Sequence, residues 1–96
     1  MSTVINNESS HRFELEESGH LAVASYRRDG NIVTIPHVES AMALRGKGTA
    51  GRLMEGTVAL ARTEGFKIRP TCPYAIAWFQ RHPEATDVLV GATEKS

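Results

Sequence analysis

Three glycines fall within six residues in the segment Arg45-Gly46-Lys47-Gly48-Thr49-Ala50-Gly51. Glycine adopts positive φ angles and lets a ligand come close to the backbone. The segment directly precedes a helical pattern, and the start of a helix offers unpaired N–H groups and the positive end of the helix dipole. We therefore expect this loop to hold an anionic group such as a phosphate. The alternative interpretation is a glycine-rich turn between a strand and a helix.

Two known phosphate-binding patterns fit this loop poorly. The spacing Gly46-x-Gly48-x-x-Gly51 matches the dinucleotide fingerprint literally, but that fingerprint needs a parallel strand–helix–strand unit and an acidic residue near the end of the next strand. The strands before the loop have an antiparallel pattern, and Lys67 and Arg69 flank the acidic position. The Walker A pattern needs Gly-Lys-Ser/Thr after four spacer residues, which this loop lacks.

The single cysteine, Cys72, directly precedes Pro73 at the expected start of a second helix. A helix N-terminus favours the thiolate form, which is the nucleophile. The competing interpretation is a buried structural cysteine. One cysteine excludes an internal disulfide and a cysteine-rich zinc site. His11 and His20 are isolated, and we expect no metal site.

The first half of the chain has the pattern of an antiparallel meander. Apolar and polar residues alternate over residues 12–16, 20–28 and 31–38, with turn signals at Ser18-Gly19 and Asp29-Gly30. Pro36 lies late in the third strand, where it predicts a bulge or a splayed end.

The second half changes to a helical period. The residues Ala50, Leu53, Met54, Thr57, Val58 and Ala61, all apolar except threonine, recur at the spacing of an amphipathic helix, and Gly65 then ends the helix. A close contact with the sheet would explain Gly56 inside this helix. A fourth strand is expected over residues 66–71. A second helix is expected from Pro73 to His82-Pro83, with a stripe of Tyr74, Ala77, Trp78 and Arg81.

The predicted element order is β-β-β-α-β-α, so the fold class is α+β, a mixed α/β sandwich. A chain of 96 residues with 41% hydrophobic and 23% charged residues predicts one globular domain. We place that domain at residues 11–90, between a disordered tail at 1–10 and a C-terminal tail at 91–96. The apolar patch Val88-Leu89-Val90 is expected to dock as a short strand or helix. Trp78 and Phe79 are expected to pack in the core.

Eleven basic residues balance eleven acidic ones. This balance argues against nucleic acid or a membrane surface as a partner, and the absence of a long apolar run or signal segment favours a cytoplasmic location. The charge is uneven along the chain. Residues 1–44 carry three basic and six acidic residues, net −3, and residues 45–82 carry seven and two, net +5. The positive segment suits an anionic ligand, although ordinary surface scatter would also explain it.

Three segments together resemble one enzyme family. Arg45-x-x-Gly48-x-Ala50 resembles the Arg/Gln-x-x-Gly-x-Gly/Ala loop of the GCN5-related N-acetyltransferases. His37-Val38-Glu39 and Pro70-Thr71-Cys72-Pro73-Tyr74, followed by Arg81-His82-Pro83-Glu84, are similar to segments of a small subfamily of that family. Val38 stands where the subfamily commonly has threonine. The resemblance covers roughly residues 11–90.

The resemblance implies that acetyl-CoA lies across the splayed third and fourth strands, with its pyrophosphate on the glycine loop. The coenzyme-binding residues would be Val38, Arg45, Gly46, Lys47, Gly48, Thr49, Ala50 and Gly51. It implies that an amine attacks either the coenzyme thioester or an acetyl group first accepted by Cys72. It also implies that His37 or Glu39 is the base and that Tyr74 is the acid for the departing thiolate. On residue chemistry alone, His37 and Glu39 are equally an exposed pair at a strand end, and Tyr74 is equally a core aromatic residue.

We therefore expect an acetyltransferase that moves an acetyl group from acetyl-CoA to a primary amine, with no metal. The acceptor amine is unknown, and the chain is expected to be a monomer or a small homo-oligomer. A non-catalytic acyl-CoA-binding or sensing module is the second hypothesis. A small interaction domain, in which the glycine loop is only a turn, is the third.

Overall fold

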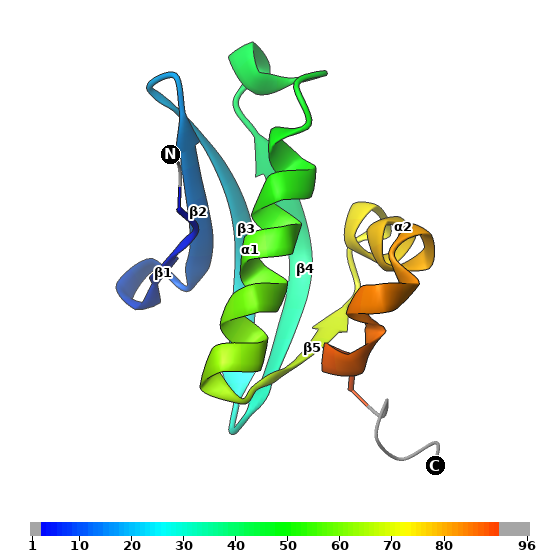
Figure 1. Cartoon of the computed structure of the whole chain (residues 1–96). Coiled ribbons are helices and arrows are strands. Elements are labelled where there is room, and N and C mark those ends of the chain that lie inside the picture. The colour runs from blue at the N-terminus through cyan, green and yellow to red at the C-terminus, as the bar shows by residue number, and fades with distance from the viewer. Residues whose placement is uncertain (1–2, 91–96) are drawn as a thin grey trace.

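Five strands form one sheet in the order β1-β2-β3-β4-β5. The computed structural model describes residues 3–90. The strands are β1 (Ile5–Asn7), β2 (Arg12–Glu17), β3 (His20–Asp29), β4 (Ile32–Ser40) and β5 (Lys67–Pro70). The helices are α1 (Thr49–Glu64) and α2 (Pro73–Arg81), and the short 3-10 helices are η1 (Glu8–Ser10), η2 (Met42–Leu44) and η3 (Pro83–Val88). Figure 1 shows α1 crossing the sheet and α2 beside it. The predicted mixed α/β class is confirmed.

The strands β1 to β4 are antiparallel to one another, which confirms the meander. Strand β5 instead runs parallel to β4, with α1 as the crossover. The sequence argument against a dinucleotide fingerprint was therefore wrong in one part, because the glycine loop does lie in a parallel strand–helix–strand unit. Its other part holds, since the β5 segment contains Lys67 and Arg69 and no acidic residue.

The N-terminal segment differs from the expected disordered tail. Residues 5–7 form β1 and pair with β2, and residues 8–10 form η1. The side chain of Asn6 accepts a 2.6 Å hydrogen bond from the Tyr26 hydroxyl, and Asn7 Oδ1 accepts from the Ser10 N–H. These polar contacts anchor a segment whose composition alone indicates disorder. The expected tail at 91–96 lies outside the described residues.

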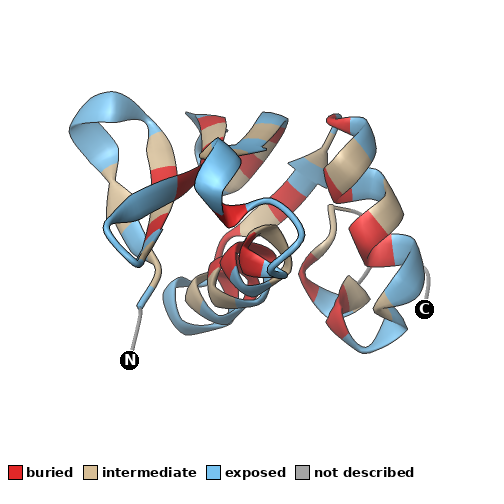
Figure 2. Ribbon diagram, turned by 90° about the horizontal axis from the view of Figure 1, so that it is seen from above, coloured by how far each residue is buried: buried red, intermediate tan, exposed pale blue. Residues whose placement is uncertain are grey.

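The core lies between the sheet and the helices. Figure 2 shows the buried positions gathered where the sheet faces α1. On α1 the buried residues are Thr49, Leu53, Met54, Thr57, Val58 and Ala61, so the predicted face is confirmed except that Ala50 is only half-buried. Gly65 ends the helix with a φ of 84°, as predicted.

Gly56 in α1 makes room for the N-terminal segment and not for the sheet. A methyl group built on Gly56 would lie only 2.7 Å from the Val4 Cβ atom. Val4 packs against the core just before β1. The expected close contact exists, but its partner is the chain that the sequence had predicted to be disordered.

The C-terminal third covers the β5 side of the sheet. On α2 the buried residues are Ala75, Trp78 and Phe79, so Trp78 and Phe79 are packing residues, as predicted. Of the other residues in the predicted stripe, Tyr74 and Ala77 are half-buried and Arg81 is exposed. Leu89 forms an isolated bridge to Ile68 of β5, so the apolar patch at 88–90 docks as expected.

A bulge in β4 changes which residues of this strand face the helices. Ser25 pairs with His37 but Arg27 pairs with Thr34, so two steps along β3 match three steps along β4. The extra residue lies at Ile35–Pro36, where Pro36 predicted it. Before the bulge, Ile35 is the residue buried in the core. After the bulge, Val38 is the residue that packs against the core.

Candidate functional site

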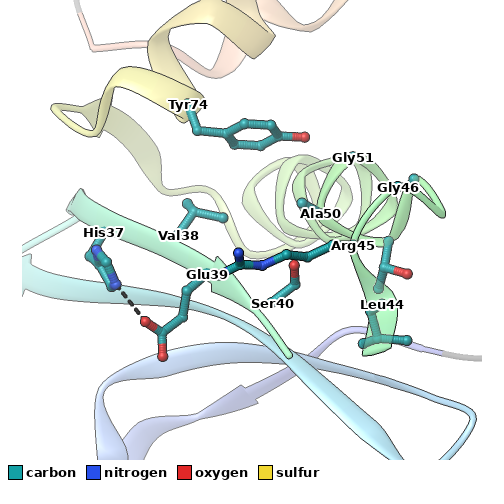
Figure 3. A pocket seen from close by; sticks show the side chains of 12 residues that line it. His37, Val38, Glu39, Ser40, Leu44, Arg45, Gly46, Ala50, Gly51 and Tyr74 are labelled. Atoms are coloured by element: carbon teal, nitrogen blue, oxygen red, sulfur yellow. Dashed lines mark hydrogen bonds and ion pairs between the residues drawn. The ribbon is translucent and has the colours of Figure 1, made fainter. Parts of the chain in front are cut away.

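A pocket of about 550 Å³ lies where β4, the N-terminus of α1 and the start of α2 meet (Figure 3). This volume is within the usual range of small-molecule sites. The lining residues come from three places in the sequence, namely His37, Val38, Glu39 and Ser40 on β4; Leu44, Arg45, Gly46, Gly48, Thr49, Ala50 and Gly51 around the glycine loop; and Tyr74 on α2.

The glycine loop lines one wall of this pocket with backbone. Gly46 and Gly48 have φ angles of 79° and 78°, a region that other residues rarely adopt. Gly48 is the N-cap of α1, and because it has no side chain, none covers the N–H groups of the first helical turn. Arg45, exposed at the pocket wall, adds a positive charge. An anion is the ligand that such a wall favours.

The opposite wall is the second half of β4, with which no other strand pairs on the pocket side within residues 3–90. β5 pairs with β4 only from Ile32 to Ile35, and β4 continues to Ser40 without it. After the bulge, Glu39 faces Val23 on β3 and the Ala41 N–H donates to the Leu21 carbonyl. Backbone N–H and C=O groups point to alternate edges of a strand. Those of Glu39 point to β3, so those of Val38 and Ser40 point to the opposite edge of β4, along which β5 does not extend. An extended ligand could pair with this edge.

His37 and Glu39 form a hydrogen-bonded pair at the rim of the pocket. Their closest atoms, His37 Nε2 and Glu39 Oε1, are 2.7 Å apart, and both side chains are well exposed. The spacing of two residues predicts that they share a face, and they do. A carboxylate only accepts hydrogen bonds, so Nε2 carries the hydrogen and Nδ1 of the neutral ring is left to accept a proton. The pair has the arrangement of an oriented base.

Tyr74 closes the pocket from the first turn of α2 (Figure 3). It is half-buried, and this burial raises the pKa of its hydroxyl, with Arg81 acting in the opposite direction. The phenol therefore stays protonated at neutral pH and is able to donate a hydrogen. A methyl group built on Gly51 would be 3.8 Å from the Tyr74 oxygen, so the hydroxyl lies beside the first turn of α1.

Cys72 lies apart from the pocket lining. It is the N-cap of α2 and is 7% exposed, within the hydrophobic core cluster. Its backbone N–H donates to the Ile35 carbonyl at 3.2 Å, which places the residue where β4 and β5 separate. The expected position at the start of the second helix is confirmed, and its role as acetyl acceptor stays a prediction.

Of the twelve residues that the sequence points to, ten line this one pocket. The two that do not are Cys72 and Lys47. The lining also includes Ser40 and Leu44, which sequence reasoning missed, although both lie in the short stretch between His37 and Arg45.

A contact outside the pocket was also missed. The carboxylate of Glu17, at the end of β2, accepts hydrogen bonds from Thr49 Oγ1 at 2.6 Å and from Arg52 Nε and Nη2, both at 2.7 Å. These residues are more than 30 positions apart in sequence, so no local pattern reveals the contact. Arg52 first and Thr49 second lower the pKa of Glu17 to about 2.

Within residues 3–90, no three His, Cys, Asp or Glu side chains gather closely enough to hold a metal ion. No helix in that range has the length and apolar character needed to cross a membrane.

Comparison with known proteins gives a consistent picture. The sequence profile of the GCN5-related N-acetyl-transferases matches residues 12–88. Among solved structures, the chain is similar to a Staphylococcus aureus protein studied by NMR and described as a candidate GCN5-like N-acetyltransferase. The TM-score is 0.69 and the sequence identity 27%, over 90% of this chain and 85% of that one. No curated protein matches significantly.

Proposed function

Since the chain belongs to the GCN5-related N-acetyltransferase family, we propose that it transfers an acetyl group from acetyl-CoA to a primary amine. One observation supports this proposal above all: within residues 3–90, the N-terminus of α1, which has no side-chain cap, lies beside the part of β4 that has no strand paired on the pocket side. The loop around Gly48 offers N–H groups to an anion, and Val38 and Ser40 offer backbone groups to an extended chain. Coenzyme A has both parts, a pyrophosphate and an amide-containing arm.

The residues of the site fit that ligand. The pyrophosphate would bind the N–H groups of the loop from Gly46 to Gly51, with Arg45 as a charged partner. The absence of a side chain at Gly48 matters because a methyl group there would already be 3.3 Å from Arg52 Nη1. The pantetheine arm would run along the β4 edge at Val38. The acetyl thioester would then lie at the β4 edge, with Tyr74 on the face of the strand that Val38 shares and the His37–Glu39 pair on the other face (Figure 3).

We propose direct transfer as the reaction. The amine nitrogen attacks the thioester carbonyl, a C–N bond forms, and the C–S bond breaks with its electron pair leaving on sulfur. His37 Nδ1, oriented by Glu39, takes the proton from the amine. Tyr74 gives its proton to the departing thiolate. This route uses the groups that line the pocket, whereas an acetyl-cysteine route needs Cys72, which lies in the core cluster.

The test is an assay of free CoA thiol with acetyl-CoA and a panel of primary amines. We expect amine-dependent thiol release by the wild-type protein and, by mass spectrometry, an acetylated amine in equal amount. A protein that binds CoA but releases no more thiol with any amine than without one would be the non-catalytic acyl-CoA-binding module. A protein that binds neither CoA nor acetyl-CoA would contradict the assignment altogether.

A further inference from the structure

We propose that Glu17 is a positioning residue for the coenzyme-binding loop, acting through Thr49 and Arg52 to fix the direction of the Gly48 amide. This inference rests on the proposed function, because the amide matters only if the loop binds the coenzyme. Glu17 itself does not line the pocket. It ends β2, just before the turn at Ser18-Gly19.

The Glu17 carboxylate reaches both ends of the first turn of α1. Oε1 accepts from the hydroxyl of Thr49, which is 1% exposed and is the first residue of the helix. Oε1 and Oε2 together accept two bonds from Arg52 in a forked pair. A forked pair fixes the plane of the guanidinium as well as its place. The carboxylate therefore determines where Arg52 points.

Arg52 in turn holds the backbone of the loop. Its Nη2 donates to the Lys47 carbonyl oxygen at 2.9 Å. A trans peptide is planar, so the Gly48 N–H points away from that carbonyl oxygen and hence away from Arg52. Gly48 lines the pocket, whereas Lys47 and Arg52 do not. The chain of bonds from Glu17 to Arg52 to the Lys47 carbonyl thus turns the Gly48 N–H to the side on which the anion would bind.

The same bonds hold Arg52 outside the pocket lining. Glu17 and the Lys47 carbonyl occupy Nε and Nη2 of its guanidinium. Without Glu17 the arginine would lose its forked partner, and the Lys47–Gly48 peptide would lose the bond that selects its orientation. Glycine tolerates many backbone conformations, so a loop with Gly46 and Gly48 needs such an external contact to stay in one.

The experiment compares two ligands that differ in the pyrophosphate. Calorimetry measures the affinity of the wild-type protein, Glu17→Gln and Glu16→Gln for CoA, and NMR titration measures their affinity for pantetheine. Glu16 is the neighbouring exposed carboxylate and makes none of these contacts, so Glu16→Gln removes the same charge one residue away. We expect Glu17→Gln to weaken CoA binding about tenfold and to leave pantetheine binding unchanged. Glu16→Gln should change neither ligand's affinity by more than about twofold.

Equal CoA affinity in Glu17→Gln and wild type would overturn the inference while leaving the proposed function intact. Equal losses for CoA and pantetheine would also overturn it, because they indicate a general structural role. A wild-type protein without CoA affinity would overturn the proposed function and the inference together. If Glu17→Gln fails to fold, Arg52→Lys serves instead, since lysine keeps the charge but cannot form the fork, and the same selective loss of CoA affinity is expected.

Discussion

The Cys72 N–H donates to the carbonyl oxygen of Ile35 at 3.2 Å, and the Thr71 N–H donates to the same oxygen at 3.1 Å. These are the last backbone bonds between the two parallel strands. Beyond them β4 bulges at Pro36 and continues to Ser40, while the chain after β5 turns into α2. The shared Ile35 carbonyl is therefore the vertex of the opening in which we place the coenzyme arm, and Cys72 lies at that vertex.

The position of Cys72 gives a first prediction. Val38 is three residues beyond Ile35, roughly 10 Å along the strand. Because Cys72 is buried and outside the pocket lining, we expect Cys72→Ala to keep the rate of amine acetylation within about threefold. The substitution should lower the free energy of unfolding by about 1 kcal/mol through lost packing. A 42-dalton adduct on wild-type Cys72 in intact-mass analysis, with transfer lost in Cys72→Ala, would instead establish the acetyl-cysteine route.

Tyr74 gives a second prediction, because its hydroxyl is the proposed acid. Tyr74→Phe removes that oxygen and keeps the half-buried ring. We expect kcat to fall about 100-fold while the Kd for CoA changes by less than about threefold. Thermal unfolding should be nearly unchanged, which separates the loss of chemistry from a loss of fold. A variant with wild-type kcat would remove Tyr74 from the mechanism.

The Glu17 carboxylate gives a third prediction, on acid stability. Arg52 and Thr49 lower its pKa from the ordinary 4.5 to about 2. A lowered pKa in the folded state stabilises the protein above the ordinary value, and this contribution is lost as the pH falls from about 4.5 to 2. Glu14, beside Arg12, and Asp87, beside Arg62, act in the same direction. Comparing the free energies of unfolding of wild type and Glu17→Gln in denaturant at each pH measures the contribution of Glu17 alone.

For that comparison we expect the two stability profiles to differ most at pH 6 to 7 and to converge as the pH approaches 2. A constant difference between wild type and Glu17→Gln at every pH would show that the carboxylate charge is not what the contact uses.

Gly56 gives a fourth prediction. Alanine is favoured over glycine inside a helix by about 1 kcal/mol, but here the added methyl group meets Val4. We expect Gly56→Ala to destabilise the fold by about 1–3 kcal/mol as an overpacked contact. Val4→Gly should remove the obstacle, because it takes away the Val4 Cβ atom as well as the methyl groups, so Gly56→Ala in that background should become neutral or stabilising. Additive effects of the two substitutions in urea unfolding would mean that the segment before β1 does not pack on α1.

The elements that local patterns specify were predictable. Alternation marked β2, β3 and β4, the glycines marked the turns and the end of α1, and Pro36 marked the bulge. The resemblance of three segments to the GCN5-related N-acetyltransferases indicated the pocket residues His37, Arg45 and Tyr74.

Features that depend on contacts between residues far apart in the sequence were not predicted. β1 contains the polar residues Asn6 and Asn7, which do not themselves predict a strand. The segment is held in place by contacts with distant residues, such as the hydrogen bond from the Tyr26 hydroxyl to Asn6. The parallel direction of β5 depends on α1 crossing the sheet, which composition does not reveal. The contact of Glu17 with Thr49 and Arg52 exists only in the folded chain, so the sequence did not indicate it.

The central claim, that the glycine loop holds the coenzyme, is tested most directly by titrating CoA into three proteins in a calorimeter. They are wild type, Gly48→Glu and the control Gly30→Glu. The control places the same side chain at a comparable positive φ in the β3–β4 turn, where the new Cβ atom would have no contact within 4 Å in the described part of the chain beyond its sequence neighbours. We expect wild type and Gly30→Glu to bind CoA alike and Gly48→Glu to bind at least about 100-fold more weakly, because its carboxylate and side chain occupy the anion site. Equal affinity in wild type and Gly48→Glu would contradict the account.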